Sequence, residues 1–380
     1  MDLVPVLGLG VTATHARPPK HREVYIDAFR GLMALAMVQG HVFDTLLTPE
    51  IRADSLYRLQ VIAHGTTAPG FLFASGFVAG LPRSPLSLRA SIRRARRLLF
   101  VLGVGYALHL PYLSLWKTLA QATPGESVAL FACDALQVIA VTQLFVLLVQ
   151  WLVGRRWTAV TGVLALVVLA AGPGVWAARL SSEVPPVLGA YLDDKAGSHF
   201  PVFPFSAFVL AGTVAGATLG RQEESVRRRR SLLWGTLLVL AGAVASAPLE
   251  SFVDFWGVSP AYALLRLGGL LLLLQGVERA ARRESPLMRP LALLGHETLL
   301  VFVFHLYLLF GGVVAPAPLG ALVGRGTLFE ASAILTLMVP VLLAVAWAWH
   351  RVKVHAPHEA SLGLAFVTTL GLFEFLTRAW

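Results

Sequence analysis

The sequence predicts an all-α fold, a polytopic bundle of transmembrane helices, and two observations support it. Hydrophobic residues make up 56% of the 380 residues and charged residues only 14%, whereas a soluble domain carries about 25% charged residues. Apolar runs of about 20 residues, long enough for a helix to span the hydrocarbon core of a bilayer, recur along the chain between short polar segments. These runs indicate an integral, multi-pass membrane protein.

About eleven transmembrane spans are predicted. No long extramembrane segment interrupts them, so we expect an N-terminal tail over residues 1–23 and a single transmembrane domain over residues 24–380. The spans are expected near residues 24–46, 58–81, 98–116, 128–153, 157–178, 201–220, 231–248, 259–277, 290–313, 327–349 and 360–377.

The net charge of +10 follows from Lys and Arg residues that fall in alternate loops. The N-terminal tail and every second loop carry 22 of them, whereas the remaining loops and the C-terminus carry 7. Because Lys and Arg concentrate in cytoplasmic loops, the N-terminal tail is predicted to lie in the cytoplasm and the C-terminus outside. The basic charge is thereby explained by topology, and no nucleic-acid partner is expected.

The first predicted span carries ionisable residues, which are costly inside a membrane and imply a partner or a function. Asp27 and Arg30 lie near its cytoplasmic end, and His41 lies about 16 Å further along at 1.5 Å per residue. The three share one helical face, so they look into the same side of the bundle. Asp27 and Arg30 could equally form an ion pair between residues three apart, and Asp44 could equally be the partner of His41.

Three residues of other spans are predicted at the depth of His41, in the outer part of the membrane. The second span runs inward and places His64 there. The fourth span also runs inward and places Asp134 and Gln137 there on one face. His41, His64 and Asp134 are therefore the candidate catalytic residues.

The inner half holds a second group of polar residues. Glu297 is expected where the ninth span enters the membrane, and His305 close to mid-depth. Arg266 is a deep cation in the eighth span, and it needs a carboxylate, a phosphate or water. Asp27 and Glu297 are its candidate structural partners, and a phosphorylated ligand is the functional alternative.

Other features have a structural interpretation. Glycines at spacing four in "GFVAG" (76–80) and "GTVAGATLG" (212–220) are typical of transmembrane helices whose backbones pack closely. His109 and His199 lie near the outer ends of their spans, where each could equally face water. The single cysteine, Cys133, is interpreted as a small apolar filler. The sequence contains no metal-binding or nucleotide-binding motif, and no metal is expected.

Five segments, taken in order, resemble those of a known family. They are "YIDAFRGLMALAMVQGHVFD", "HGTTAPGFLFASGF", "DALQVIAV", "FPVFPFSAFVLAGTVAG" and "LGHETLLVFVFHLYLLFG". They are similar to segments of the heparan-alpha-glucosaminide N-acetyltransferase-like multi-pass acyltransferases and, more distantly, of the membrane acyltransferase-3 proteins. Thr298 stands where that family usually has Ser.

The resemblance implies transfer of an acyl group from cytosolic acyl-CoA, typically acetyl-CoA, to a sugar or other amine or hydroxyl acceptor on the far side. It maps the family's essential histidine onto His41 or His64. A histidine has the pKa that a general base needs near neutral pH, and Asp134 could hold its second ring nitrogen. Substrate-binding or donor-binding roles are expected for Asp27, Arg30, Gln137, Arg266, Glu297 and His305.

Two other functions fit the same residues. A row of Asp, Arg, Gln and His residues through a helix bundle is also typical of a proton-coupled transporter or permease. Transporters of this kind often contain inverted repeats, and the two halves of the chain show none. A non-catalytic membrane scaffold would use these residues only to pair helices. The expected location is the inner (cytoplasmic) membrane of a bacterium, the expected partners are the lipid bilayer, acyl-CoA and a polar cell-envelope acceptor, and a homodimer is compatible with the sequence.

Overall fold

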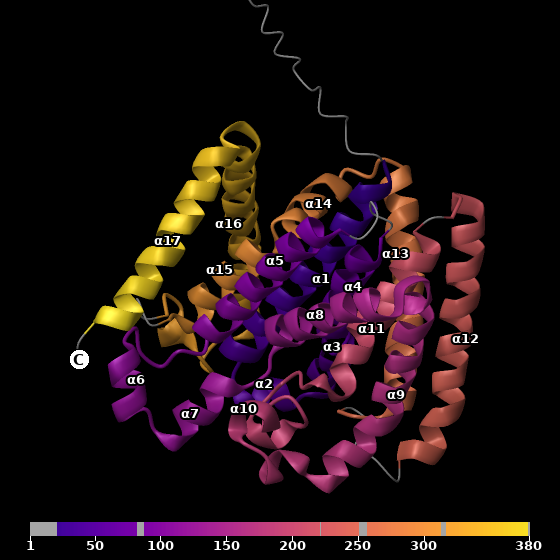
Figure 1. The fold of residues 1–380 in the computed structure, drawn as a ribbon. Helices are drawn as coiled ribbons and strands as arrows, with labels where there is room; N and C mark the ends of the chain where they lie inside the picture. Colours follow the sequence, from indigo (N-terminus) through magenta and orange to yellow (C-terminus); the bar gives the residue numbers. More distant parts are fainter. Residues whose placement is uncertain (1–20, 82–86, 221, 251–256, 313–316, 379–380) are drawn as a thin grey trace, which may run out of the picture.

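The computed structural model describes residues 21–81, 87–220, 222–250, 257–312 and 317–378 (Figure 1). This part of the chain is helical throughout and contains no strand, only an isolated β-bridge between Leu47 and Gly326. The predicted all-α fold is therefore confirmed. Most of the predicted N-terminal tail, residues 1–20, lies outside the described residues.

Seventeen α-helices and four short 3-10 helices follow one another in the described residues. The α-helices are α1 (His21–Leu46), α2 (Pro49–Ala53), α3 (Ser55–His64), α4 (Thr67–Gly80), α5 (Leu88–Ala107), α6 (Leu115–Gln121), α7 (Pro124–Phe131), α8 (Ala135–Val153), α9 (Trp157–Ala178), α10 (Pro186–Gly189), α11 (Val202–Leu219), α12 (Glu224–Glu250), α13 (Pro260–Arg282), α14 (Met288–His296), α15 (Thr298–Phe310), α16 (Leu328–His355) and α17 (Pro357–Thr377). The 3-10 helices are η1 (Gly154–Arg156), η2 (Leu180–Glu183), η3 (Asp194–Ala196) and η4 (Gly320–Leu322).

Several helices are long and apolar enough to cross a membrane. Five helical segments meet both conditions, and α14 with α15 makes a sixth if this bent pair is counted as one span. The five are Ala135–Ala178, Val202–Leu219, Pro260–Arg282, Leu328–His355 and Pro357–Thr377. The structure therefore supports an integral membrane protein, while eleven crossings and a cytoplasmic N-terminus stay predictions.

Four of the predicted spans are not single helices. The span at 98–116 contains the end of α5, at Ala107, and the first residues of α6. The span at 58–81 is divided into α3 and α4 at Gly65 and Thr66, and the span at 128–153 is divided into α7 and α8. The span at 290–313 becomes α14 and α15, which meet at an angle of 84°. The last break lies at Glu297, whose backbone leaves the helical conformation and whose carboxylate binds side chains of α16. An apolar run thus predicts a span but not the positions at which its helix breaks.

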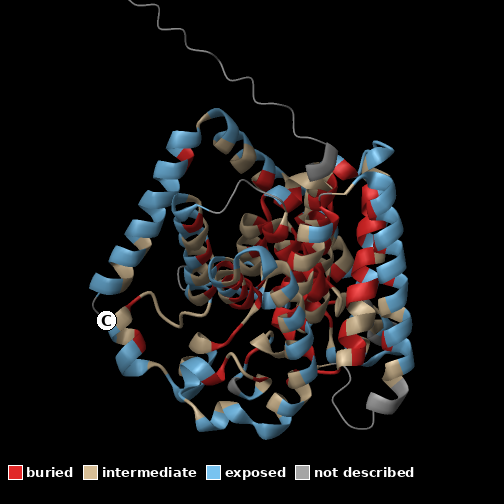
Figure 2. Ribbon diagram, turned by 45° about the vertical axis from the view of Figure 1, so that its right-hand side comes forward, coloured by how far each residue is buried: buried red, intermediate tan, exposed pale blue. Residues whose placement is uncertain are grey.

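The core of the bundle is built on closely packed glycines. A Cβ atom at Gly76 or Gly80 of α4 would collide with the backbone of α11, and one at Gly212 or Gly216 of α11 would collide with the backbone of α4. The predicted packing role of both glycine motifs is confirmed. Figure 2 shows the buried residues concentrated in the middle of the bundle, whereas the hairpin of α16 and α17 is mostly exposed.

The short helices gather at one end of the molecule. Figure 1 shows α2, α6, α7 and α10 at the lower end, and α14 with the turn between α16 and α17 at the upper end. Backbone hydrogen bonds tie the last turn of α1 to the segment before α16 at the lower end, where Gly324 and Gly326 donate to Thr45 and Leu46. Helices α2, α6, α7 and α10 lie in or next to segments predicted for the outer face, and α14 and the α16–α17 turn lie in or next to segments predicted for the inner face.

Candidate functional site

Three histidines from three helices meet at one place. Nδ1 of His41, on α1, lies 2.9 Å from Nε2 of His305, on α15. The rings of these two residues are stacked, with centroids 5.2 Å apart. The ring of His64, at the end of α3, lies 6.2 Å from that of His41, centroid to centroid. The predicted proximity of His41 and His64 is therefore observed, and His305, which was expected nearer mid-depth, joins them in a histidine cluster.

The partners of His305 determine which ring nitrogen carries each proton. His305 is fully buried, and its Nδ1 lies 3.0 Å from the backbone carbonyl oxygen of Val301, to which only an N–H can donate. Nε2 of the neutral His305 ring is then the acceptor, so Nδ1 of His41 is the donor. Nε2 of His41 therefore keeps a free lone pair, and the half-buried His41 ring can present it to a ligand.

His64 is held beside this pair by small and acidic neighbours. A Cβ atom at Gly40 would collide with the His64 ring, so the ring lies directly against the α1 backbone. Nε2 of His64 lies 3.9 Å from a carboxylate oxygen of Asp44, which also accepts a hydrogen bond from the hydroxyl of Tyr57. Asp44, which sequence reasoning treated only as an alternative partner of His41, is thus the carboxylate of the histidine cluster.

Asp134 hydrogen-bonds to two other histidines and is an electrostatic neighbour of His41. Its two carboxylate oxygens lie 3.0 Å from Nε2 of His109 and 2.9 Å from Nδ1 of His199. The hydrogen bond to Asp134 raises the pKa of His199, because it stabilises the charged ring. Depth along the helices placed all these residues at one level, but it did not reveal which way each side chain points around its helix.

Gln137 is the polar residue of this region with the fewest partners. Its side chain is fully buried on α8, and neither amide atom has a hydrogen-bond partner in the described part of the protein. The amide lies against Gly105 of α5, where a Cβ atom would be 2.9 Å from the amide oxygen. It faces α5 and does not join Asp134.

At the other end of α1, Asp27 and Arg30 form the ion pair that the sequence allowed. Nη1 of Arg30 lies 3.1 Å from the Asp27 carboxylate. Nη2 of Arg30 donates to the hydroxyl of Thr298, at 2.6 Å, and so links α1 to the start of α15. Nδ1 of His296 lies 3.7 Å from the same carboxylate, and Arg97 of α5 is an electrostatic neighbour of Arg30.

Glu297 anchors the bend between α14 and α15. Its carboxylate is only 3% exposed and lies 2.7 Å from Nζ of Lys353 and 3.1 Å from Nδ1 of His350, both on α16. His350 and Lys353 were not predicted as site residues, although their spacing of three places both on one helical face. Together with Asp27, Arg30 and His296, these three residues form the Glu297 cluster.

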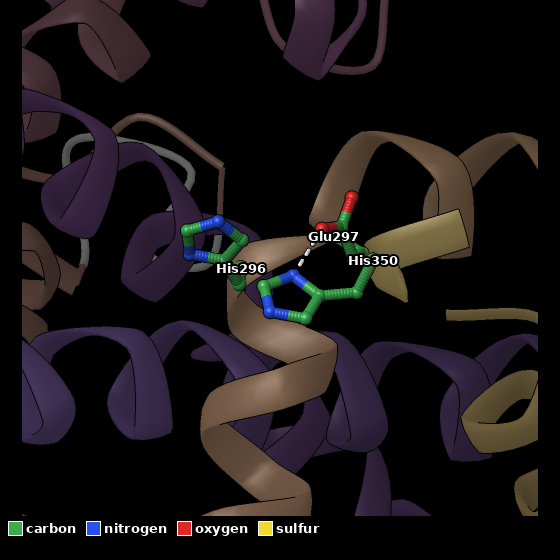
Figure 3. Close-up of side chains that lie close together, drawn as sticks. All are labelled: His296, Glu297 and His350. Atoms are coloured by element: carbon green, nitrogen blue, oxygen red, sulfur yellow. Dashed lines mark hydrogen bonds and ion pairs between the residues drawn. The ribbon is translucent and has the colours of Figure 1, made fainter. Parts of the chain in front are cut away.

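The same cluster contains the one set of metal-type ligands found in the described residues. Ligand atoms of His296, Glu297 and His350 all lie within 4.8 Å of one another (Figure 3). Two imidazoles and a carboxylate are ligands that Zn²⁺ accepts. The Glu297 carboxylate already has a cation, because Lys353 binds it.

Arg266 lies away from both of its predicted structural partners. Its guanidinium stacks on the ring of Tyr262, 3.6 Å from the centroid, on the same helix α13. A Cβ atom at Gly65 would be 3.2 Å from Nη2 of Arg266, so the guanidinium lies beside the break between α3 and α4. Arg266 therefore neighbours Gly65, whereas Asp27 and Glu297 pair with other cations.

The histidine cluster and the Glu297 cluster are joined by α1. The histidine cluster lies toward the end with the short helices, and the Glu297 cluster lies about 16 Å away by the helical rise between Arg30 and His41. One place offers an imidazole with a free lone pair, and the other offers several cations near the end of the bundle. This arrangement suits a two-substrate reaction whose reactants enter from opposite ends.

Comparison with known proteins gives the family. No curated protein matches the chain. The model of the acyltransferase-3 family, described as an acyltransferase domain, matches residues 23–349. That range contains every residue of both clusters except His350 and Lys353. The matched family is the more distant of the two that the sequence resembles. The chain therefore belongs to the acyltransferase-3 family, a family of membrane acyltransferases.

Proposed function

We propose that the protein transfers an acyl group, typically acetyl, from cytosolic acyl-CoA to a hydroxyl or amine of a sugar or another polar acceptor at the outer side of a bacterial inner membrane. The observation that carries the proposal is the hydrogen bond between His41 and His305. It orients one imidazole and leaves its second nitrogen free, which is the arrangement a general base requires.

In the proposed reaction, Nε2 of His41 takes the proton of the acceptor O–H or N–H. The acceptor oxygen or nitrogen forms a bond to the acyl carbonyl carbon, and the thioester C–S bond breaks. The proton then passes from His41 to the sulfur, so that CoA leaves as the thiol. His305 accepts a hydrogen bond from Nδ1 of His41 throughout, and so holds the ring in the tautomer that can act as a base.

The proposed donor end is the Glu297 cluster. Arg30 and Lys353 are paired with Asp27 and Glu297 there, and the exposed Arg97 beside Arg30 adds positive charge, which suits the phosphates of a CoA nucleotide. The excess of Lys and Arg in the loops of this end supports its cytoplasmic location. The thioester would reach along α1 toward His41, which supports acceptor binding at the opposite end.

A transporter and a scaffold remain the alternatives in this proposal. Family membership favours neither, since the matched domain is an acyltransferase domain. Transport of a solute without any CoA-dependent product would favour the transporter. Equal loss of folded yield and of activity in every histidine variant would favour the scaffold.

The test compares chemistry with donor binding in one preparation. Purified protein in detergent should gain thermal stability from acetyl-CoA, because a ligand that binds only the folded state stabilises it. His41→Ala should lower acyl transfer about 100-fold or more, the usual effect of losing a general base, and should keep the acetyl-CoA shift. His358→Ala, an exposed histidine on α17, is the matched control and should keep full activity.

The acceptor is identified by mass spectrometry of cell-envelope glycans and small amines from cells with and without the protein. An acyl group that appears only with the wild-type protein and disappears with His41→Ala supports the proposal. Normal acyl transfer by His41→Ala, or no thermal shift at millimolar acetyl-CoA, would overturn it.

A further inference from the structure

We propose that Arg266 binds an anionic group, a carboxylate or a phosphate, carried by the acceptor. The inference deepens the proposed function and rests on it, because it names the class of acceptor that the histidine cluster receives. The site consists of the Arg266 guanidinium, the ring of Tyr262 and the backbone at Gly65, which follows His64 in the chain.

The first argument is charge balance. Two other poorly exposed arginines have a carboxylate partner: Arg30 binds Asp27, and Arg227 binds Glu278. Within the described ranges Arg266 has no carboxylate partner, and its Nε is buried without a hydrogen-bond partner. Its polar neighbour is Tyr262, which supplies a ring face and a hydroxyl but no negative charge. A cation inside a membrane helix is expected to have an anion as its partner.

The second argument is the shape of the site around the guanidinium. Gly65 has no side chain, and a Cβ atom there would be 3.2 Å from Nη2 of Arg266 and 3.3 Å from the Tyr262 hydroxyl. Helix α4 begins two residues later, at Thr67, so its positive end adds to the field of Arg266. A side chain at residue 65 would therefore press on the guanidinium, and the nearby start of α4 also favours an anion.

The third argument is the distance to the proposed base. His64 is adjacent to Gly65 in the chain, and its Nδ1 is buried without a partner among the described residues. Its ring centroid lies 6.2 Å from that of His41. An acceptor whose acidic group binds Arg266 can therefore present a nearby hydroxyl or amine to Nε2 of His41. The Glu297 cluster differs, because both of its carboxylates already neutralise a cation.

The test uses pairs of probes of which only one member carries negative charge. N-acetylglucosamine 1-phosphate is compared with N-acetylglucosamine, and glucuronate with glucose, at constant ionic strength, by thermal shift of the purified protein. The phosphate and the carboxylate arms distinguish the two sources of charge. An anionic probe should bind wild-type protein about 10-fold or more tightly than its neutral counterpart, the usual advantage of a charge-assisted hydrogen bond.

Variants assign the effect to Arg266. Arg266→Gln should lose the difference between anionic and neutral probes, and Arg266→Lys should keep part of it because the charge remains. Arg325→Gln is the matched control, since Arg325 is an exposed arginine in the loop before α16, and it should retain the full difference. Equal binding of charged and neutral probes by the wild type, or an unchanged preference in Arg266→Gln, would overturn the inference.

The acetyl-CoA shift, measured in the same samples, separates this inference from the proposed function. A normal acetyl-CoA shift without any preference for anionic probes removes the role of Arg266 and leaves acyl transfer intact. A preference for anionic probes without an acetyl-CoA shift retains Arg266 as an anion site and removes the acyltransferase proposal.

Discussion

His305 has no exposed surface, so any contribution it makes to proton transfer reaches the acceptor through His41. It is therefore a positioning residue in the proposed reaction. The residue that orients a catalytic histidine is usually a carboxylate, whereas here a neutral imidazole accepts the hydrogen bond of His41. A neutral partner fixes the tautomer of His41 but stabilises the imidazolium less than a carboxylate would. The negative charge of Asp44, which lies next to His64, can also stabilise the imidazolium form of His41.

The role of His305 can be tested by asking which side chains restore it. His305→Gln keeps an oxygen that can accept from Nδ1 of His41, whereas His305→Phe fills the space without an acceptor. We expect His305→Gln to retain acyl transfer within about 10-fold of the wild type, and His305→Phe to lose more, mainly in kcat. Equal activity of the two variants, measured with both proteins folded and binding acetyl-CoA, would show that His305 only packs.

At the scale of single elements, α1 and α14 are held together by backbone contact. A Cβ atom at Gly295 would collide with the carbonyl oxygen of Asp27, and one at Gly31 would collide with that of Leu291. The same contact brings His296 to Asp27 and Thr298 to Arg30. Helix packing and the proposed donor end therefore depend on the same two glycines.

Gly295→Ala should separate these two helices. We expect a loss of about 1–3 kcal/mol in stability, the usual cost of overpacking, together with a weaker acetyl-CoA shift. Thermal unfolding in detergent measures both quantities. Gly276→Ala on α13, where a Cβ atom meets nothing within 4 Å, is the control, and an equal effect of the two substitutions would contradict the role of the close contact.

The bond between His199 and Asp134 links the loop before α11 to the start of α8. Because this bond raises the pKa of His199 in the folded protein, its contribution to stability is fully present below the unfolded pKa, about 6.5. The contribution is lost as pH rises through the folded pKa. The link between the two segments is therefore strongest in mildly acidic solution.

His199→Asn should consequently lower the melting temperature most at about pH 5.5, and the difference from the wild type should shrink toward pH 9. The measurement is thermal unfolding across that range, with His358→Asn as the control. A difference that grows with pH would show that Asp134 does not stabilise the charged ring.

Counting residues along predicted spans located part of the site and missed the rest for a physical reason. It placed His41 and His64 at one level, because the helical rise converts position into depth. It placed His305 nearer the inner half, since the count assumed a straight span, whereas the chain bends by 84° at Glu297. It did not identify His109 and His199 as the hydrogen-bond partners of Asp134, because depth does not specify the direction in which a side chain leaves its helix.

At the scale of the whole molecule, α2, α6, α7 and α10 lie at one end and α14 with the α16–α17 turn at the other (Figure 1), and the distribution of basic residues predicts that the second end faces the cytoplasm. Cysteines placed at Ala53 and Ser182 should react with an impermeant thiol reagent from outside, whereas one at Ser225 should react only after lysis. All three positions are exposed, and the native Cys133 is buried, so the background is low. The reverse labelling pattern would invert the proposed direction of transfer.

Helix α17 is 21 residues long and buries a single residue, Ala360. At 1.5 Å per residue it measures about 31 Å, close to the thickness of a bilayer core. Lipid acyl chains, more than protein neighbours, would therefore set its tilt. In a detergent micelle the geometry of α17 would follow the size of the micelle, while the histidine cluster, packed among other helices, would keep its arrangement.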